Sequence, residues 1–319
     1  MEDSRPSQLP GVSIVVPVFQ STTSLPVLLR GVRQALADRP LEFILVDDGS
    51  GAATRATLRE LAGQEGVTVL RLGRNSGQHA ALLAGIRSAE HPLTVTIDDD
   101  LQHPPDMIPR LLQTLEREGT DVVYGWSPFP AQKWWRRVGS ATIRRILSTA
   151  LDVPSAANMS AFRAFRTRLR DGFAEPLGPG VSIDALLGWS TSNFSFVEVD
   201  HQPRAEGTTG YNLRRLFRFA IDTLTGYSVL PLRLVSFIGI ASSLLGFALL
   251  AYVLIGFMFR GSPVAGFPFL ASVIAIFSGL QMLALGIIGE YLGRMHLRIQ
   301  RRPTYVIAER LPDHCDERA

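Results

Sequence analysis

Three consecutive aspartates, Asp98, Asp99 and Asp100, directly follow the apolar run LTVTI at residues 93–97. Like charges this close repel one another, so a compensating charge is expected nearby. If the backbone stays extended through the aspartates, Asp98 and Asp100 share one face and Asp99 points the other way. Two carboxylates and the amide oxygen of Gln102 would form the oxygen-rich site that Mg²⁺ or Mn²⁺ prefers. An ordinary acidic turn is the alternative interpretation.

A second acidic pair, Asp47-Asp48, follows the apolar run LEFILV at residues 41–46 and leads into Gly49-Ser50. Carboxylates at a strand end can hydrogen-bond the base or ribose of a nucleotide, although a plain Asp-Gly turn has the same sequence. The chain contains no G-x-G-x-x-G motif after its first strand and no G-x-x-x-x-G-K-[ST] motif. The usual dinucleotide and P-loop sites are therefore excluded.

The elements that must position these acids alternate between two patterns in the first half of the chain. Apolar, β-rich runs predict strands, and apolar residues at helical spacing predict helices between them. The predicted strands are 12–19, 41–46, 67–72, 93–97 and 121–125, and the clearest helices are 25–36 and 77–90. This alternation predicts an α/β fold with a mostly parallel, doubly wound sheet. Ligands bind beyond the carboxyl ends of the strands in such sheets, where both acidic clusters fall.

Two long uncharged stretches, 234–259 and 261–289, lie in the last third of the chain. Because about 20 apolar residues cross the hydrocarbon core of a bilayer, each stretch is long enough for a transmembrane helix. A buried helix pair in a soluble protein is the alternative. Arginines gather on both sides of the two stretches, and only Arg260 lies between them. This distribution favours a hairpin whose two ends are cytoplasmic.

These patterns divide the chain into four parts: a cytosolic α/β domain at 1–210, an amphipathic juxtamembrane region at 211–232, two transmembrane helices at 233–293, and a cytosolic tail at 294–319. The segment 212–224 has a basic and an apolar face, which suits a membrane surface, although packing on the domain itself stays open. The net charge of +3 gives no reason to expect nucleic acid. The single cysteine, Cys315, excludes an intramolecular disulfide.

Several segments occur in a familiar order: VPVF (16–19), VDDGS (46–50), RNSGQHAALLAGI (74–86) and DDDLQHPP (98–105). They resemble the family 2 glycosyltransferases of the GT-A fold, and more narrowly the polyprenyl-phosphate glycosyltransferases, which include dolichol-phosphate mannose synthase and the bactoprenol glucosyltransferases. Segments 204–222, 228–234, 289–294 and 302–307 resemble the same subfamily. The resemblance implies a Rossmann-like GT-A domain followed by a C-terminal two-helix transmembrane hairpin.

The resemblance also implies roles for individual residues. Those implied to bind the nucleotide-sugar donor are Pro17, Phe19, Asp47, Asp48, Asn75, Gln78, Asp98 and Asp99. Those implied to hold Mg²⁺ or Mn²⁺ are Asp98, Asp100 and Gln102. Those implied to meet the acceptor phosphate are Arg136, Ser140, Arg163 and Arg204. Asp98, Asp100 and Arg204 are the residues expected to be catalytic.

The implied reaction moves a sugar from a UDP- or GDP-sugar to polyprenyl phosphate, with inversion, on the cytoplasmic face of the cytoplasmic membrane. Many bacterial members carry an aspartate where this chain has Ala161. A phosphate monoester has a second pKa of about 6 and needs no strong base at neutral pH, so this difference need not abolish activity. A non-catalytic nucleotide- or lipid-binding membrane protein and a metal-dependent phosphohydrolase are the rival hypotheses. The sugar, the choice of UDP or GDP, and a homo-oligomeric state stay open.

Overall fold

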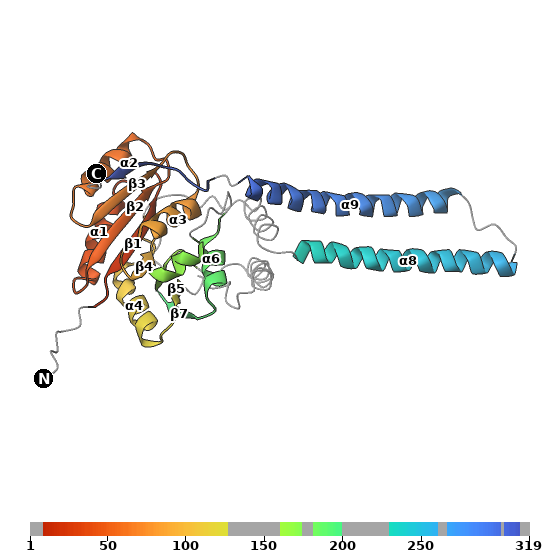
Figure 1. Cartoon of the computed structure of the whole chain (residues 1–319), viewed down its shortest axis with the longest axis horizontal. Coiled ribbons are helices and arrows are strands. Elements are labelled where there is room, and N and C mark those ends of the chain that lie inside the picture. The colour runs from red at the N-terminus through yellow and green to blue at the C-terminus, as the bar shows by residue number, and fades with distance from the viewer. Residues whose placement is uncertain are drawn as a thin grey trace. The chain divides into compact units, whose positions relative to one another are not determined.

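The computed structural model of the chain describes residues 9–126, 160–173, 181–199, 230–260, 267–300 and 303–312. The chain forms two compact units. The first contains Met1–Gly210 together with Arg301–Ala319, and the second contains Tyr211–Gln300. The first unit is an α/β domain, and the second contains two long helices (Figure 1).

The α/β domain is built on one eight-stranded sheet with the strand order β7-β5-β6-β4-β1-β2-β3-β8. The strands are β1 (Val12–Val18), β2 (Leu41–Asp47), β3 (Val67–Leu72), β4 (Leu93–Thr96), β5 (Val122–Trp126), β6 (Arg163–Arg166), β7 (Phe194–Glu198) and β8 (Ile307–Leu311). The parallel pairs are β1-β2, β1-β4, β2-β3 and β5-β7. The antiparallel pairs are β3-β8, β4-β6 and β5-β6, so the sheet is mixed.

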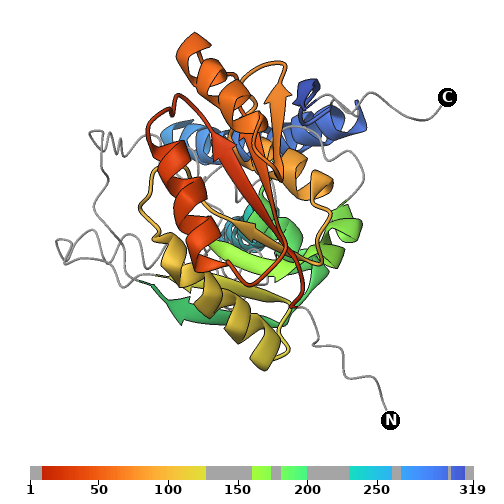
Figure 2. The ribbon, with the colours of Figure 1, turned by 90° about the vertical axis from the view of Figure 1, so that its left-hand side faces the viewer.

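Helices cover both faces of the sheet, as Figure 2 shows. They are α1 (Ser24–Ala35), α2 (Ala52–Ala62), α3 (Gln78–Ser88), α4 (Ile108–Arg117) and α6 (Ile183–Ser190), with 3₁₀ turns η1 (Pro105–Met107) and η3 (Thr167–Phe173). Apolar side chains of α1, α2 and α4 form one core cluster with the sheet. Those of α3, α6 and η3 form a second cluster on the other face. The predicted α/β class is therefore confirmed.

The central strands are continuous apolar runs because helices bury them on both sides. All seven residues of β1 are buried, as are the last five of β2. β6, β7 and β8 are the strands that sequence reasoning missed. Their sequences, RAFR, FSFVE and IAERL, are short and interrupted by polar or charged side chains, so none contains the continuous apolar run that predicts a buried strand.

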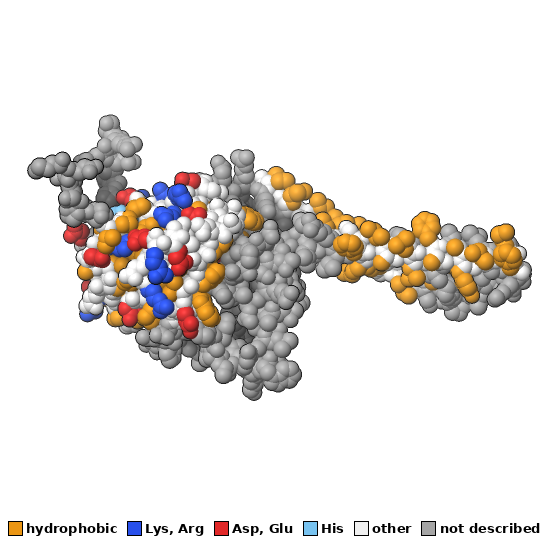
Figure 3. Space-filling view, turned by 90° about the horizontal axis from the view of Figure 1, so that it is seen from below, with side chains coloured by type: hydrophobic (Ala, Val, Ile, Leu, Met, Phe, Trp, Pro, Cys, Tyr) orange, Lys and Arg blue, Asp and Glu red, His pale blue; other side chains and the backbone are white. Residues whose placement is uncertain are grey.

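The second unit contains α8 (Leu230–Arg260) and α9 (Phe267–Ile299), which lie side by side in Figure 1. They approach closely at Gly246, where a Cβ atom would lie 3.5 Å from Cζ of Phe277. Exposed apolar side chains dominate the surface of these helices (Figure 3). Within the described residues, α9 contains one stretch, Ile276–Gly293, that is long and apolar enough to cross a membrane. The apolar stretch in α8, Val235–Ala248, is shorter, so the second span of the predicted hairpin is not confirmed.

Candidate functional site

Both acidic clusters lie at the same edge of the sheet. β1 has β2 on one side and β4 on the other, and all three strands run in parallel. Their carboxyl ends therefore meet, which brings Asp47 and Asp48 of β2 close to the aspartates that follow β4. The end of β1 lies between them and carries Phe19, whose side chain is 53% exposed. Pro17 is buried within β1.

Asp48 holds the loop that precedes α3. Its Oδ1 accepts a hydrogen bond from the backbone N–H of Ser76 at 2.6 Å, and its Oδ2 accepts one from Gly77 at 2.9 Å. Burial raises the pKa of Asp48, while these two hydrogen bonds partly offset the rise. Gly49 has a φ of +80°, and a Cβ there would lie 2.8 Å from the backbone nitrogen of Asn75. The glycine therefore lets the two loops touch, which fixes the exposed Asn75 at the edge of the site.

The three consecutive aspartates contact three different parts of the chain. Asp98 Oδ1 accepts a hydrogen bond from Nε2 of Gln78 in α3 at 2.7 Å. Asp99 Oδ2 accepts one from the backbone N–H of Phe19 at 3.4 Å. The backbone N–H of Gln102 donates to Asp100 Oδ1 at 3.2 Å. The aspartates thus connect the ends of β1, β4 and α3.

The backbone at these aspartates is not extended. β4 ends at Thr96, Asp99 and Asp100 lie in a turn, and Leu101 has a φ of +58°. The expectation that Asp98 and Asp100 share a face by strand alternation is therefore wrong in its premise. Positive φ at a residue with a side chain is strained and is concentrated at functional sites. Gln20, at the end of β1, shows the same feature with a φ of +58°.

The aspartates are incompletely compensated. Burial, followed by the charges of Asp100 and Asp99, raises the pKa of Asp98 from 3.8 to about 6. The positive charge of Arg163 and the hydrogen bond from Gln78 act in the opposite direction. Burial also raises the pKa of Asp99 to about 6. A nearby cation would relieve this repulsion, as the sequence led us to expect.

The described residues contain no group of three His, Cys, Asp or Glu side chains that could hold a metal ion by itself. Mg²⁺ is commonly bound through one or two carboxylates, with substrate phosphates and water completing its shell. The carboxylates of Asp98 and Asp100 therefore fit a cation that is shared with a bound diphosphate. Gln102 follows two residues after Asp100, and its side chain is partly exposed.

Arg163 differs from its predicted role. It is 1% exposed, and its guanidinium forms an ion pair with Asp184 at the start of α6. Its Nε donates to Oγ1 of Thr96 at 3.1 Å, and the Tyr124 hydroxyl donates to Asp184 at 3.2 Å. The positive charge of Arg163 lowers the pKa of Asp98. A contact between Arg163 and an acceptor phosphate is therefore excluded in this conformation, because the guanidinium is buried and paired.

Sequence reasoning also missed Gln20 and Ser50. The backbone N–H of Gln20 donates to Oγ of Ser50 at 3.1 Å, and Gln20 Oε1 accepts from Gly51 at 3.4 Å. These contacts join the end of β1 to the start of α2. Arg136, Ser140 and Arg204 lie outside the described residues, and their predicted roles stay predictions.

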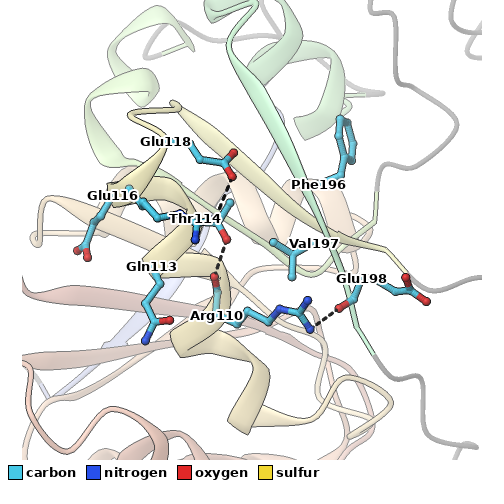
Figure 4. A pocket seen from close by; sticks show the side chains of 9 residues that line it. Arg110, Gln113, Thr114, Glu116, Glu118, Phe196, Val197 and Glu198 are labelled. Atoms are coloured by element: carbon cyan, nitrogen blue, oxygen red, sulfur yellow. Dashed lines mark hydrogen bonds and ion pairs between the residues drawn. The ribbon is translucent and has the colours of Figure 1, made fainter.

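A groove with a volume of about 840 Å³ lies elsewhere, between α4 and β7 (Figure 4). Nη1 of Arg110 donates to the carbonyl of Glu198 at 3.2 Å, and Oγ1 of Thr114 donates to the carbonyl of Arg110 at 2.9 Å. Charges of both signs line this groove, and none of the predicted site residues lines it. The acidic clusters, and not this groove, therefore define the candidate site.

The fold and the position of the site define an α/β protein of the GT-A class. Solved structures of glucosyl-3-phosphoglycerate synthase from Mycobacterium tuberculosis share the fold. The complex with Mn²⁺, UDP and phosphoglyceric acid has a TM-score of 0.52 and 17% identity, and covers 68% of this chain and 76% of that one. The complex with Mn²⁺, UDP and glucosyl-3-phosphoglycerate has a TM-score of 0.51 and 18% identity. It covers 68% of this chain and 78% of that one.

Glycosyl transferase family 2 matches residues 13–172. Undecaprenyl-phosphate 4-deoxy-4-formamido-L-arabinose transferase from Aeromonas hydrophila is 34% identical over 303 residues, which cover 93% of this chain and 92% of that protein. The enzyme of the same name from Pseudomonas aeruginosa is 33% identical over 309 residues, which cover 95% of this chain and 91% of that protein. The chain belongs to glycosyltransferase family 2 and is a glycosyltransferase.

Proposed function

We propose that the protein transfers a sugar from a nucleotide diphosphate donor to polyprenyl phosphate at a membrane surface. The observation that carries the proposal is the meeting of two acidic clusters at one sheet edge, where Asp48 holds one loop and Gln78 holds Asp98. The names of the relatives support undecaprenyl phosphate as the acceptor and 4-deoxy-4-formamido-L-arabinose as the first sugar to test.

In this proposal, Asp98 and Asp100 hold a divalent cation, with Gln102 beside them. Bound there, Mg²⁺ or Mn²⁺ would supply positive charge for the leaving nucleoside diphosphate. Gln78 fixes the orientation of Asp98 through its 2.7 Å hydrogen bond. Asp99 holds the end of β1, so that the exposed ring of Phe19 is positioned for a nucleobase.

The acceptor requires positioning more than activation, because its phosphate is mostly dianionic at neutral pH. Positioning calls for cations near the reacting oxygen. We propose Arg136, Ser140 and Arg204 for that task, and leave out Arg163 because it is buried against Asp184. We expect a single displacement with inversion, as the resemblance to the polyprenyl-phosphate glycosyltransferases implies.

We also propose that α8 and α9 form a transmembrane hairpin. The chain leaves the catalytic unit after Gly210 and rejoins it at Arg301, and β8 is a strand of the catalytic sheet. A segment whose two ends belong to one domain crosses a bilayer an even number of times. The excess of arginines at both ends of the hairpin supports a cytoplasmic catalytic domain and cytoplasmic termini.

A transfer assay on the purified full chain tests the function. The protein would receive radiolabelled UDP- or GDP-sugars, undecaprenyl phosphate and Mg²⁺ or Mn²⁺, and labelled lipid would be extracted into organic solvent. We expect transfer that EDTA and Asp100→Asn abolish, while Asp106→Asn, an exposed acid in η1, remains active. Nucleotide binding without transfer would favour the non-catalytic alternative. Release of free sugar or sugar phosphate without lipid would favour a phosphohydrolase.

A further inference from the structure

The strand that closes one edge of the catalytic sheet comes from the C-terminal end of the chain. β8 follows α9 and pairs antiparallel with β3. Its register places Glu309 opposite Arg71 and Leu311 opposite Val69. On the other side of β3, Arg71 is the register partner of Asp47 in β2. Asp47, Arg71 and Glu309 therefore form one row across three strands, at the edge of the proposed donor site.

This charged row faces α2. Residues paired directly across neighbouring strands project to the same face, and so do residues two apart in one strand. Val69 and Leu311, in the adjacent row, pack in the core cluster that α1 and α2 cover. The row Asp47, Arg71 and Glu309 lies on that same face, where Arg59 of α2 joins it.

Glu309 is the ion-pair partner of Arg71 in this row, although Nε of Arg71 makes no hydrogen bond within the described residues. Nε of Arg71 lies 2.9 Å from Oε2 of Glu309, and Nη2 of Arg59 lies 3.9 Å from Oε1. The side chains of Arg71 and Glu309 are 33% and 28% exposed, so the pair is partly shielded from solvent. The carboxylate of Glu309 is thus positioned to compete with Asp47 for the Arg71 guanidinium.

Asp47 has one satisfied and one unsatisfied oxygen. The side chain is 1% exposed, and Oδ1 accepts a hydrogen bond from the backbone N–H of Ser50 at 2.7 Å. Oδ2 is buried and has no hydrogen-bond partner among the described residues. Asp47, Arg71 and Glu309 line a cavity of about 10 Å³ together with Arg55 and Arg59 of α2, and this is room for roughly one water molecule. A buried carboxylate oxygen without a partner is costly, so Oδ2 should accept a hydrogen bond when a donor group arrives.

We propose that Glu309 is a positioning residue for the donor site: by pairing with Arg71 it keeps Asp47 Oδ2 available to an N–H group of the nucleobase. The inference rests on the proposed nucleotide site at Asp47. Neighbouring strands lie only about 4.8 Å apart, so Arg71 without its partner on β8 is within reach of Asp47. β8, which follows the two helices that we propose to span the membrane, thereby contributes to donor affinity.

The test is nucleotide binding to the full chain in detergent, measured by titration calorimetry with UDP and GDP in the presence of Mn²⁺. We expect Glu309→Gln to raise the dissociation constant about tenfold, because Arg71 then occupies the Asp47 oxygen. The double variant Arg71→Gln/Glu309→Gln should bind as the wild type does, because it lacks the guanidinium that Glu309→Gln releases, while Arg55 and Arg59 are present in both variants. Glu118→Gln, which removes an acid paired with Arg117 after α4, is the matched control and should leave binding unchanged.

Two results would overturn the proposal. One is an unchanged dissociation constant in Glu309→Gln. The other is a double variant that binds as weakly as Glu309→Gln, because Glu309 would then support the fold without steering Arg71. A wild-type chain that binds neither nucleotide is distinguishable from both, because it defeats the proposed function and this inference together.

Discussion

Replacing Asp98 with asparagine should stabilise the fold in the absence of divalent cations while abolishing sugar transfer. Burial, followed by the charges of Asp100 and Asp99, raises the pKa of Asp98 to about 6 from 3.8. The carboxylate is therefore harder to ionise in the folded chain than in the unfolded one, so keeping it ionised costs folding free energy at neutral pH. Asparagine has nearly the same shape and can still accept the hydrogen bond from Gln78, but it carries no charge.

The size of the effect follows from the pKa difference. A difference of about two units, at 1.36 kcal/mol per unit, sets an upper bound of about 3 kcal/mol. Solvent screening reduces this because the Asp98 side chain is partly exposed, so we expect about 1.5 kcal/mol. In a domain of this size, that free energy raises the unfolding midpoint by about 4 °C.

The effect should also depend on pH in a fixed direction. Well below pH 3.8 the carboxyl is protonated in both the folded and the unfolded chain, and the wild type carries no cost. The cost grows as the pH rises from about 4 to 6, through the unfolded and then the folded pKa, and is constant above that. The advantage of Asp98→Asn should therefore appear over the same interval and disappear in acid.

Thermal unfolding of the full chain in detergent and EDTA, followed by intrinsic fluorescence from about pH 3 to 8, measures this advantage. Asp106→Asn is the control, because Asp106 is exposed in η1. Mn²⁺ should raise the midpoint of the wild type and leave that of Asp98→Asn unchanged. The reasoning is refuted if Asp98→Asn is no more stable than Asp106→Asn at about pH 7.5, or if its advantage persists in acid.

Two further variants probe the support of the site. Asp184→Asn leaves Arg163 buried without its counter-charge and should lower the free energy of unfolding by about 3 kcal/mol. The double variant Asp184→Asn/Arg163→Leu should recover part of this loss in the same thermal assay. Asp48→Ala removes the acceptor of two backbone N–H groups and should raise the donor KM about tenfold with a smaller change in kcat, measured from initial rates. An unchanged KM would mean that the loop holds its position without Asp48.

The parts of the fold that sequence predicted are those where local pattern and burial agree. The central strands β1, β2, β3 and β4 are apolar because helices cover both faces, so their sequences alone indicated strands within one or two residues of the observed bounds. Because these strands are parallel, their carboxyl ends meet at one edge of the sheet, and the acids that follow them could be predicted to lie there. The charged strands β6 and β8 could not be found in this way, since their conformations depend on pairing with β4, β5 and β3, which are distant in sequence.

The orientations of the site residues were harder to predict than their positions. Strand alternation could not apply to Asp99 because the backbone turns after Thr96, and only the tertiary contact with Phe19 shows where its carboxylate points. Arg163 was assigned to the acceptor because its charge matches phosphate, but its partner Asp184 comes from α6, which no local pattern connects to β6. In both cases the residue type predicted the kind of interaction that the side chain makes. The partner, which is distant in sequence, determined where that interaction is made. The same reasoning explains why Glu309, on a strand that sequence did not predict, was absent from the site predicted around Asp47.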